Sequence, residues 1–243
     1  MGSSRNRATR VRFAGVIFAA VLFLSCQNKA KEENRQGLHY LRQGQYEQAI
    51  AEFTNALLAD NNWLPAYYNR AVCYANTGQY KEALNDFNYM LAHYPEHAES
   101  YFNRGILFEN IGVYPNAIKD YSQAIQLHPN FATAYHYRGI ARFYTRDYEG
   151  ALADYNKAIE LGLAEAGLYF NRGVVRQIQG DTESAIKDYS EAISVDPSGA
   201  RSYYNRGIAY LKQGETGEAQ KDLEIALRLG FSKAADLLDT YFR

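Results

Sequence analysis

The sequence predicts an all-α fold, an α-solenoid of six two-helix hairpins that is closed at its C-terminal end by one further helix. Three observations lead to this fold class. A unit of 34 residues recurs six times without insertion or deletion, apolar residues recur at helical spacing within each unit, and glycine or proline recurs where the helices should end. Repeats of this length stack because one unit cannot bury its apolar face alone.

The clearest mark of the repeat is a short cluster of aromatic, asparagine, arginine and glycine residues. Its five full copies are Tyr67-Tyr68-Asn69-Arg70-Ala71, Tyr101-Phe102-Asn103-Arg104-Gly105, Tyr135-His136-Tyr137-Arg138-Gly139, Tyr169-Phe170-Asn171-Arg172-Gly173 and Tyr203-Tyr204-Asn205-Arg206-Gly207. A degenerate first copy begins at Glu33. The array therefore divides into six repeats, at 30–63, 64–97, 98–131, 132–165, 166–199 and 200–233.

Three positions of the repeat predict how the two helices of each hairpin pack. A small residue at position 8 lets the helices approach, an alanine at position 20 is expected to face it, and a large residue at position 24 fills the space beside them. Position 8 holds Gly37, Ala71, Gly105, Gly139, Gly173 and Gly207. Position 20 holds Ala49, Ala83, Ala117, Ala151, Ala185 and Ala219. Position 24 holds Phe53, Phe87, Tyr121, Tyr155, Tyr189 and Leu223.

Glycine and proline mark the helix ends. The first helix of a repeat is predicted to end at Gly44, Gly78, Gly112, Gly180 or Gly214, and Arg146 replaces this glycine in the fourth repeat. The second helix ends at Pro95, Pro129 or Pro197, or at Gly162 or Gly230 where proline is absent. Residues 234–243 are predicted to form a capping helix, with apolar residues at helical spacing: Ala234, Leu237, Leu238, Tyr241 and Phe242.

From residue 30 to about 233, these positions resemble the tetratricopeptide repeat (TPR). The resemblance implies a right-handed solenoid whose first helices line a concave groove through positions 2, 6, 9 and 13 of each repeat. The first repeat departs from the pattern at Glu33, where an aromatic residue is usual, and the fourth departs at Tyr137 and Arg146.

Position 6 of the repeat supplies candidate ligand-binding residues. An amide offers both a donor and an acceptor, which suits the backbone of an extended peptide, and the series resembles the asparagine ladder in the TPR superhelix of O-linked N-acetylglucosamine transferase. The alternative is that these amides bridge neighbouring helices and that the aromatic residues at position 5 pack between repeats. The candidate partner-binding residues are Asn69, Asn103, Asn171, Asn205, Tyr68, Phe102, His136, Tyr137, Phe170 and Tyr204.

Basic residues at two further positions of the repeat are candidates for anion binding. The arginines at position 7 are expected to pair with acidic residues at position 23 instead of binding a ligand, because the two series match. A clamp for a terminal carboxylate, found in co-chaperone TPR proteins, is not supported, because position 2 does not bring two basic groups together. Position 2 holds Pro65, Glu99, Thr133, Gly167 and Arg201.

No catalytic motif occurs in the sequence, so we expect no enzyme, no cofactor, no metal site and no small-molecule substrate. His93 and His97 flank a proline that breaks helical ligand spacing, which indicates a turn with surface histidines. Cys73 lies in an apolar helix and is expected to be a buried hydrophobic residue. The net charge of −1 does not suit nucleic acid, which calls for clustered lysine and arginine.

The first 25 residues predict an export signal of the lipoprotein type. Four arginines precede an apolar run at 13–24, which is shorter than the ~20 residues needed to span a bilayer. The segment Leu22-Phe23-Leu24-Ser25-Cys26 resembles the lipobox of bacterial lipoproteins, which implies cleavage before Cys26 and acylation of that residue. A plain signal peptide that ends near a cysteine is the alternative. Residues 26–29 would form a short tether to the membrane.

The sequence thus favours a protein-binding TPR adaptor of a bacterial cell envelope, anchored in a membrane, with the outer membrane as the expected one. A partner protein or peptide would lie in the groove. The alternative is a structural or self-associating subunit of an envelope assembly that uses the convex face or the terminal helix. Removal of the first 25 residues takes away four arginines and no acid, so the mature chain would carry a charge of about −5.

Overall fold

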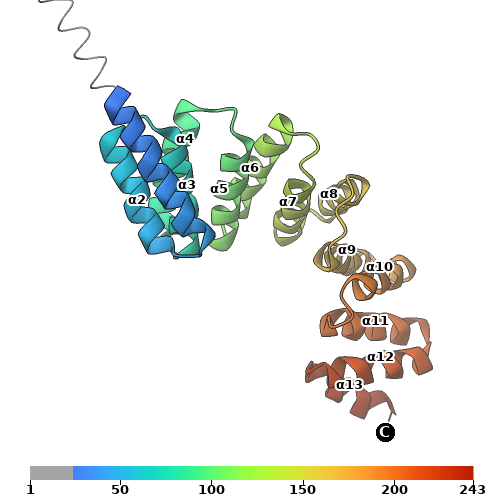
Figure 1. Ribbon diagram of the computed structural model, residues 1–243. Coiled ribbons are helices and arrows are strands. Elements are labelled where there is room, and N and C mark those ends of the chain that lie inside the picture. The colour runs from blue at the N-terminus through green and yellow to red at the C-terminus, as the bar shows by residue number, and fades with distance from the viewer. Residues whose placement is uncertain (1–23, 243) are drawn as a thin grey trace, which may run out of the picture. The chain divides into compact units, whose positions relative to one another are not determined.

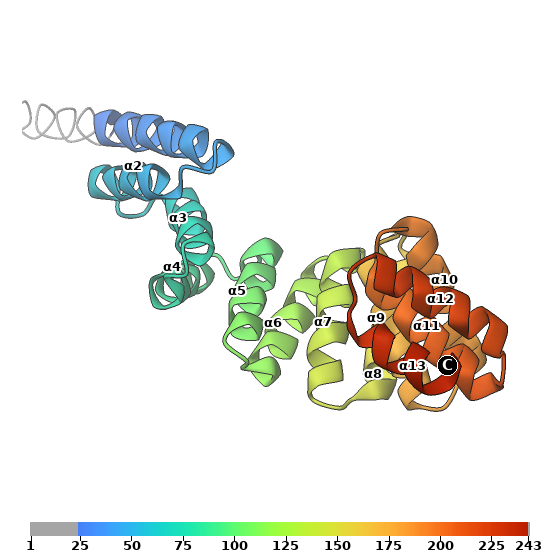
Figure 2. The ribbon, with the colours of Figure 1, turned by 90° about the horizontal axis from the view of Figure 1, so that it is seen from below.

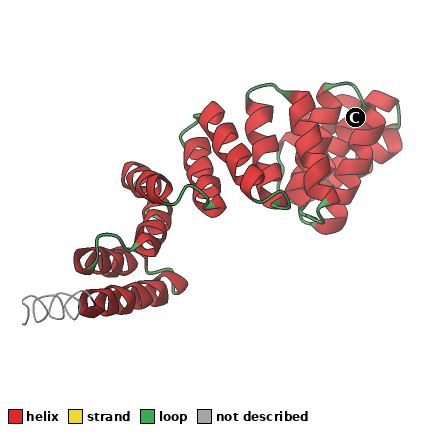
Figure 3. Cartoon of the chain, turned by 90° about the horizontal axis from the view of Figure 1, so that it is seen from above, coloured by secondary structure: helices red, strands yellow, loops and turns green. Residues whose placement is uncertain are grey.

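The computed structural model describes residues 24–242, and the described residues fold into helices without strands (Figure 3). Residues 24–42 form an N-terminal helix. The helices that follow are α2 (Tyr46–Ala59), α3 (Leu64–Asn76), α4 (Tyr80–His93), α5 (Ala98–Asn110), α6 (Tyr114–Leu127), α7 (Ala132–Tyr144), α8 (Tyr148–Glu160), α9 (Ala166–Ile178), α10 (Thr182–Val195), α11 (Ala200–Gln213), α12 (Thr216–Arg228) and α13 (Lys233–Phe242) (Figure 1). The chain divides into two compact units between Leu107 and Phe108, within α5.

Each predicted repeat corresponds to one pair of helices, so the predicted α-solenoid of helix hairpins is confirmed. In the C-terminal unit, α7 packs on α8, α9 on α10 and α11 on α12, and each pair contacts the next (Figures 1 and 2). In the N-terminal unit, α3 packs on α4 and also contacts α2 of the preceding repeat. Within the described residues of each unit, these helix contacts join a repeat to its neighbours along the chain, which is the property that defines a solenoid.

The close approach of the two helices depends on the small residue at position 8, and its nearest neighbour is the large residue at position 24. A methyl group on Gly139 would lie 2.5 Å from Cε1 of Tyr155, and one on Gly173 would lie 2.8 Å from Cε1 of Tyr189. The ring at position 24 thus occupies the space that a side chain at position 8 would need. The alanines at position 20 are fully buried beside this contact.

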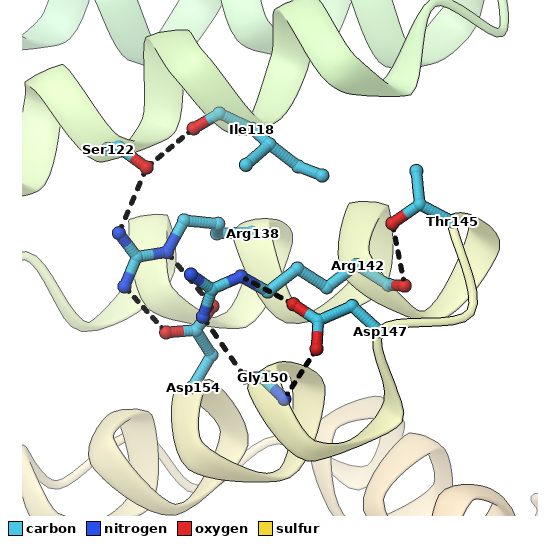
Figure 4. Close-up of polar contacts among 8 residues, drawn as sticks. All are labelled: Ile118, Ser122, Arg138, Arg142, Thr145, Asp147, Gly150 and Asp154. Atoms are coloured by element: carbon cyan, nitrogen blue, oxygen red, sulfur yellow. Dashed lines mark hydrogen bonds and ion pairs between the residues drawn. The ribbon is translucent and has the colours of Figure 1, made fainter.

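The arginine at position 7 joins three helices, and its predicted pairing with an acidic residue is confirmed. Arg138 donates two hydrogen bonds to Asp154, from Nε at 2.9 Å and from Nη2 at 2.7 Å. Its Nη1 donates to the hydroxyl of Ser122 in the preceding repeat at 3.0 Å (Figure 4). The same aspartate pairing is present at Arg70–Asp86, Arg172–Asp188 and Arg206–Asp222. The residues that accept from Nη1 are Thr54, Asn88, Ser122, Asn156 and Ser190.

A second arginine strengthens this contact in the fourth and fifth repeats, and the sequence analysis did not anticipate it. Nη1 of Arg142 donates to Asp154 at 2.8 Å and to the backbone carbonyl of Gly150 at 3.2 Å (Figure 4). Arg176 donates to Asp188 at 2.8 Å in the same way. One nearly buried aspartate therefore accepts hydrogen bonds from two arginines in each of these repeats.

The turn between the helices of a hairpin adopts a left-handed backbone conformation. The glycines expected at this turn have φ between 71° and 86°. Arg146, which replaces the glycine in the fourth repeat, is held at φ 64°, and it is the one non-glycine residue with positive φ in the described part of the chain. A side chain makes this conformation costly, by ~1–2 kcal/mol.

The predicted capping helix is present as α13, which begins one residue early at Lys233. Ala234 is fully buried, and Leu237, Leu238 and Phe242 pack around Leu223 of α12. Tyr241 was expected to join this cluster, but its helical position leaves it 60% exposed.

The predicted signal at residues 1–25 lies almost entirely outside the described residues. Residues 26–29, the expected tether, belong to the N-terminal helix in this uncleaved chain. Cys26 is exposed and its thiol is free. Within residues 24–242, every helix is too short or too polar to cross a membrane.

Replacing Arg146 with glycine should raise the free energy of unfolding by about 0.5–1 kcal/mol, because relief of the left-handed strain exceeds the entropy that glycine adds to the unfolded chain. Urea denaturation of the full-length protein measures the change. The control is Thr145→Gly, at φ −86° in the same turn, which should lower stability. Equal effects of the two substitutions would refute the role of strain.

Asp188→Asn should lower the free energy of unfolding by about 3 kcal/mol, because Arg172 and Arg176 would both lose their charged acceptor in a largely buried setting. Glu183→Gln is the matched control. It removes one negative charge from the same helix, where Glu183 pairs with Lys187 at the surface, and should change stability by less than about 0.5 kcal/mol. A similar loss of stability in both variants would contradict the proposed contribution of the buried Asp188 to the free energy of unfolding.

Candidate functional site

Two adjoining cavities lie on the first helices of the last two repeats, both within the C-terminal unit. One has a volume of about 440 Å³ and is lined by Phe170, Arg201, Tyr204, Asn205, Phe231 and Lys233. The other has a volume of about 420 Å³ and is lined by Val174, Gln177, Ile178, Asn205 and Lys212. Asn205 borders both, and we call the two cavities together the C-terminal groove. Positions 2, 6, 9 and 13, the predicted ligand-facing positions, all contribute to it.

The wall of the first cavity is aromatic. The rings of Tyr204 and Phe231 lie 4.7 Å apart between centroids, at an angle of 54°. Phe231 comes from the turn before α13, and Phe170 comes from α9 of the preceding repeat. These three side chains are half-buried, so each keeps one face open to the cavity.

The rim of the groove is basic. Arg201, Lys212 and Lys233 are exposed and make no ion pair or hydrogen bond with the described residues, and no acidic residue lines either cavity. Position 2 by itself does not bring two basic groups together, but Lys233 lines the same cavity as Arg201 from the last position of the sixth repeat, at the start of α13.

In the N-terminal unit, the asparagines at position 6 bridge neighbouring repeats. Nδ2 of Asn69 donates to Oδ1 of Asn34 at 3.3 Å. Nδ2 of Asn103 donates to the hydroxyl of Tyr68 at 3.0 Å. In both cases the acceptor is the residue at position 5 of the preceding repeat. These contacts favour the alternative interpretation, in which the amides have a structural role.

In the C-terminal unit, the asparagines at position 6 do not bridge to a neighbouring repeat. The half-buried amides of Asn171 and Asn205 make no hydrogen bond with any residue between 24 and 242. The amide of Asn205 lies between the two cavities. Because these amides keep some exposure and have a free donor and a free acceptor, the two side chains are suited to bind an external ligand.

The fourth repeat interrupts the asparagine series, and its candidate residue His136 is buried. His136 is only 5% exposed, and neither ring nitrogen makes a hydrogen bond with the described residues. Burial lowers the pKa of His136, while the carboxylate of Glu165, 3.4 Å from Nδ1, acts in the opposite direction. Tyr137 is half-buried, and burial raises its pKa. His136 therefore offers little surface to a partner.

The other residues singled out in the sequence lie where a structural role explains them. Tyr68 and Phe102 are half-buried at position 5, as expected for residues that pack between repeats. Cys73 is fully buried, and burial raises the pKa of its thiol to about 12, which confirms the prediction of a buried hydrophobic residue. His93 is exposed, whereas His97 is half-buried and contacts the hydroxyl of Ser100 through Nδ1 at 2.8 Å. Within residues 24–242 there is no group of three or more His, Cys, Asp and Glu side chains that could hold a metal ion.

Three solved structures illustrate what this chain is similar to. A crystal structure of MamA is 27% identical, covers 68% of this chain and 96% of its own, and superposes with a TM-score of 0.63. PilF of Pseudomonas aeruginosa is 18% identical, covers 89% and 99%, and has a TM-score of 0.77. YrrB, described as a TPR protein with an unusual peptide-binding site, is 20% identical, covers 73% and 92%, and has a TM-score of 0.65. No curated protein sequence matches significantly.

Sequence models of the repeat match most of the array. Models of the tetratricopeptide repeat match residues 34–92, 132–162 and 200–229, and a further TPR repeat model matches residues 111–145 and 175–214. The order of the helices, the packing at positions 8 and 24 and these matches agree with one another. The chain belongs to the tetratricopeptide repeat family.

Proposed function

We propose that this protein is a non-enzymatic adaptor that holds an extended segment of a partner protein in the C-terminal groove. TPR proteins serve as scaffolds for protein–protein interaction, and the amides of Asn171 and Asn205 carry the finer proposal. They recur one repeat apart on the ligand-facing helices and have no partner among the described residues. The description of YrrB as a protein with a peptide-binding site is consistent with this use of the fold.

The amide side chain suits an extended peptide because it provides a donor and an acceptor to the backbone, whatever the sequence of the peptide. Neighbouring cavities then hold the side chains that project from that backbone. Volumes of about 440 and 420 Å³ are within the range of ~300–1,000 Å³ that ligand-binding cavities occupy. A backbone contact flanked by two side-chain cavities supports binding of a segment instead of a folded surface.

The test compares two pairs of asparagines at the same position of the repeat. A photoreactive amino acid in place of Val174 should crosslink the partner in the native cell, and Asn171→Ala with Asn205→Ala should reduce the yield by about tenfold through lost hydrogen bonds. The matched control is Asn69→Ala with Asn103→Ala, which should cost about 1 kcal/mol of stability and leave the yield unchanged. Equal yields from both pairs would refute binding by the C-terminal amides.

We also propose that the adaptor is anchored to a membrane of a bacterial envelope by acyl chains on Cys26. The residues that precede Cys26 support this proposal, and so does the exposure of its thiol. Each buried methylene of an acyl chain contributes ~0.8 kcal/mol, so more than one chain is needed for stable attachment. Cleavage before Cys26 would leave the first repeat only a few residues from the lipid.

Cys26→Ala should abolish incorporation of labelled palmitate and release the protein from the membrane fraction. Cys73→Ala is the control, because Cys73 is the only other cysteine and is buried away from acylating enzymes. Label that persists in the Cys26 variant, or membrane association that is unchanged, would show that the anchor lies elsewhere.

A further inference from the structure

We infer that the C-terminal groove selects an acidic, internal segment of its partner, with an apolar residue between the acidic ones. This inference rests on the proposed function and specifies its ligand. One carboxylate would pair with Arg201 and Lys233, the apolar side chain would lie against the rings of Tyr204 and Phe231, and a second carboxylate would reach Lys212. The amide of Asn205 would hold the backbone between the two carboxylates.

The charges of the groove differ from those of the rest of the array. At position 7, four arginines are paired with nearly buried aspartates, so their charge is balanced within the fold. The three basic residues of the groove make no such pair with the described residues, and no acid lines the cavities. This basic concavity belongs to a chain whose net charge is −1, so it is a local feature and not a consequence of composition. Concave surfaces of one sign concentrate ligands of the opposite sign.

The aromatic wall requires an apolar residue in the same ligand. A purely acidic segment would satisfy Arg201 and Lys233 but would leave the three half-buried rings in contact with water. Filling the cavity with an aliphatic or aromatic side chain removes this apolar surface from water, which contributes roughly 25 cal/mol for each Å² buried. The cavity of about 440 Å³ has room for such a side chain beside a carboxylate.

The spacing of the basic residues favours an internal segment over a chain terminus. Arg201 and Lys212 lie 11 residues apart in sequence on α11, which places them about 16 Å apart along the helix axis at 1.5 Å per residue. An extended peptide advances roughly 3.3 Å per residue, so about five residues span this distance. A single terminal carboxylate would engage only one end of the groove, whereas two acidic side chains about five residues apart would engage both.

Fluorescence anisotropy with blocked, labelled peptides tests the inference on the full-length protein in detergent. The first probe is acetyl-Glu-Leu-Ala-Ser-Ala-Glu-Ala-amide, the second has glutamine in place of both glutamates, and the third is the glutamine peptide with a free terminal carboxylate. The first should bind at least about tenfold more tightly than the second, because charge-assisted hydrogen bonds are the stronger ones. The difference should shrink as salt is added, since exposed charges are screened.

Substitutions of the three basic residues of the groove, with one control, test which of them contact the acidic peptide. Arg201→Gln and Lys233→Gln should each weaken binding of the acidic peptide by about fivefold or more and leave binding of the glutamine peptide unchanged. Lys212→Gln should do the same with a peptide that keeps only the second glutamate. The control, Lys187→Gln, removes the same charge from α10, where Lys187 pairs with Glu183 at the surface, and should have no effect. Circular dichroism confirms that each variant is folded.

Several results would overturn the inference. Equal binding of the acidic and glutamine peptides would mean that the groove holds peptides without reading their charge, and the adaptor proposal would stand. Tightest binding of the peptide with the free carboxylate would identify a chain terminus as the ligand. Failure of every peptide to bind would also refute the inference, and crosslinking from position 174 would then decide separately whether the groove binds a partner.

Discussion

The arginine at position 7 is the contact on which the array depends. A solenoid has no single core, so each junction between repeats must be stable by itself. This arginine serves the junction in three ways, because it binds an aspartate in the second helix of its own repeat, reaches a polar residue of the preceding repeat, and lies over a tyrosine ring at position 4. The guanidinium carbon of Arg138 lies 5.4 Å from the ring centroid of Tyr135, and similar contacts recur in four other repeats. The abundance of tyrosine in the sequence follows in part from this arrangement.

Because these arginines are paired inside the fold, the first helices of the repeats are free to vary at other positions. Position 6 illustrates the result. The asparagine is the same residue in four repeats, yet in the N-terminal unit it bridges to position 5, whereas in the C-terminal unit Asn205 faces two cavities. For Asn205, the difference arises from position 5 of the preceding repeat. Asn34 and Tyr68 offer an oxygen to the amide of the following repeat, whereas Phe170 cannot accept a hydrogen bond.

Features that recur with the period of 34 residues could be predicted from the sequence, and features that occur in one or two repeats could not. The hairpins, their glycine turns and the arginine pairing recur, so each copy supports the others. Arg142 and Arg176 share position 11 in two repeats only, so no periodic signal was available. The other four repeats have an aromatic residue there: Tyr40, Tyr74, Phe108 and Tyr210. Burial of His136 was missed for the same reason, since the pattern at position 5 indicates an aromatic residue but not how deeply it lies. The shared cavity of Arg201 and Lys233 depends on Lys233, at the last position of the sixth repeat, where no other repeat has lysine or arginine.

Placement of the groove beside α13 has a consequence for how this protein can change over generations. Repeat arrays gain and lose whole units by duplication and deletion, and most junctions in this chain would accept another copy because each is nearly equivalent to the next. A seventh unit inserted after residue 233 would place its own first helix where α13 now packs, and the cavity would keep its lining only if that helix again seats Lys233 and Phe231 beside Tyr204. Units added before residue 166 would leave both cavities intact. The array can thus lengthen before residue 166 without touching either cavity, whereas growth at the other end must reproduce the packing of α13.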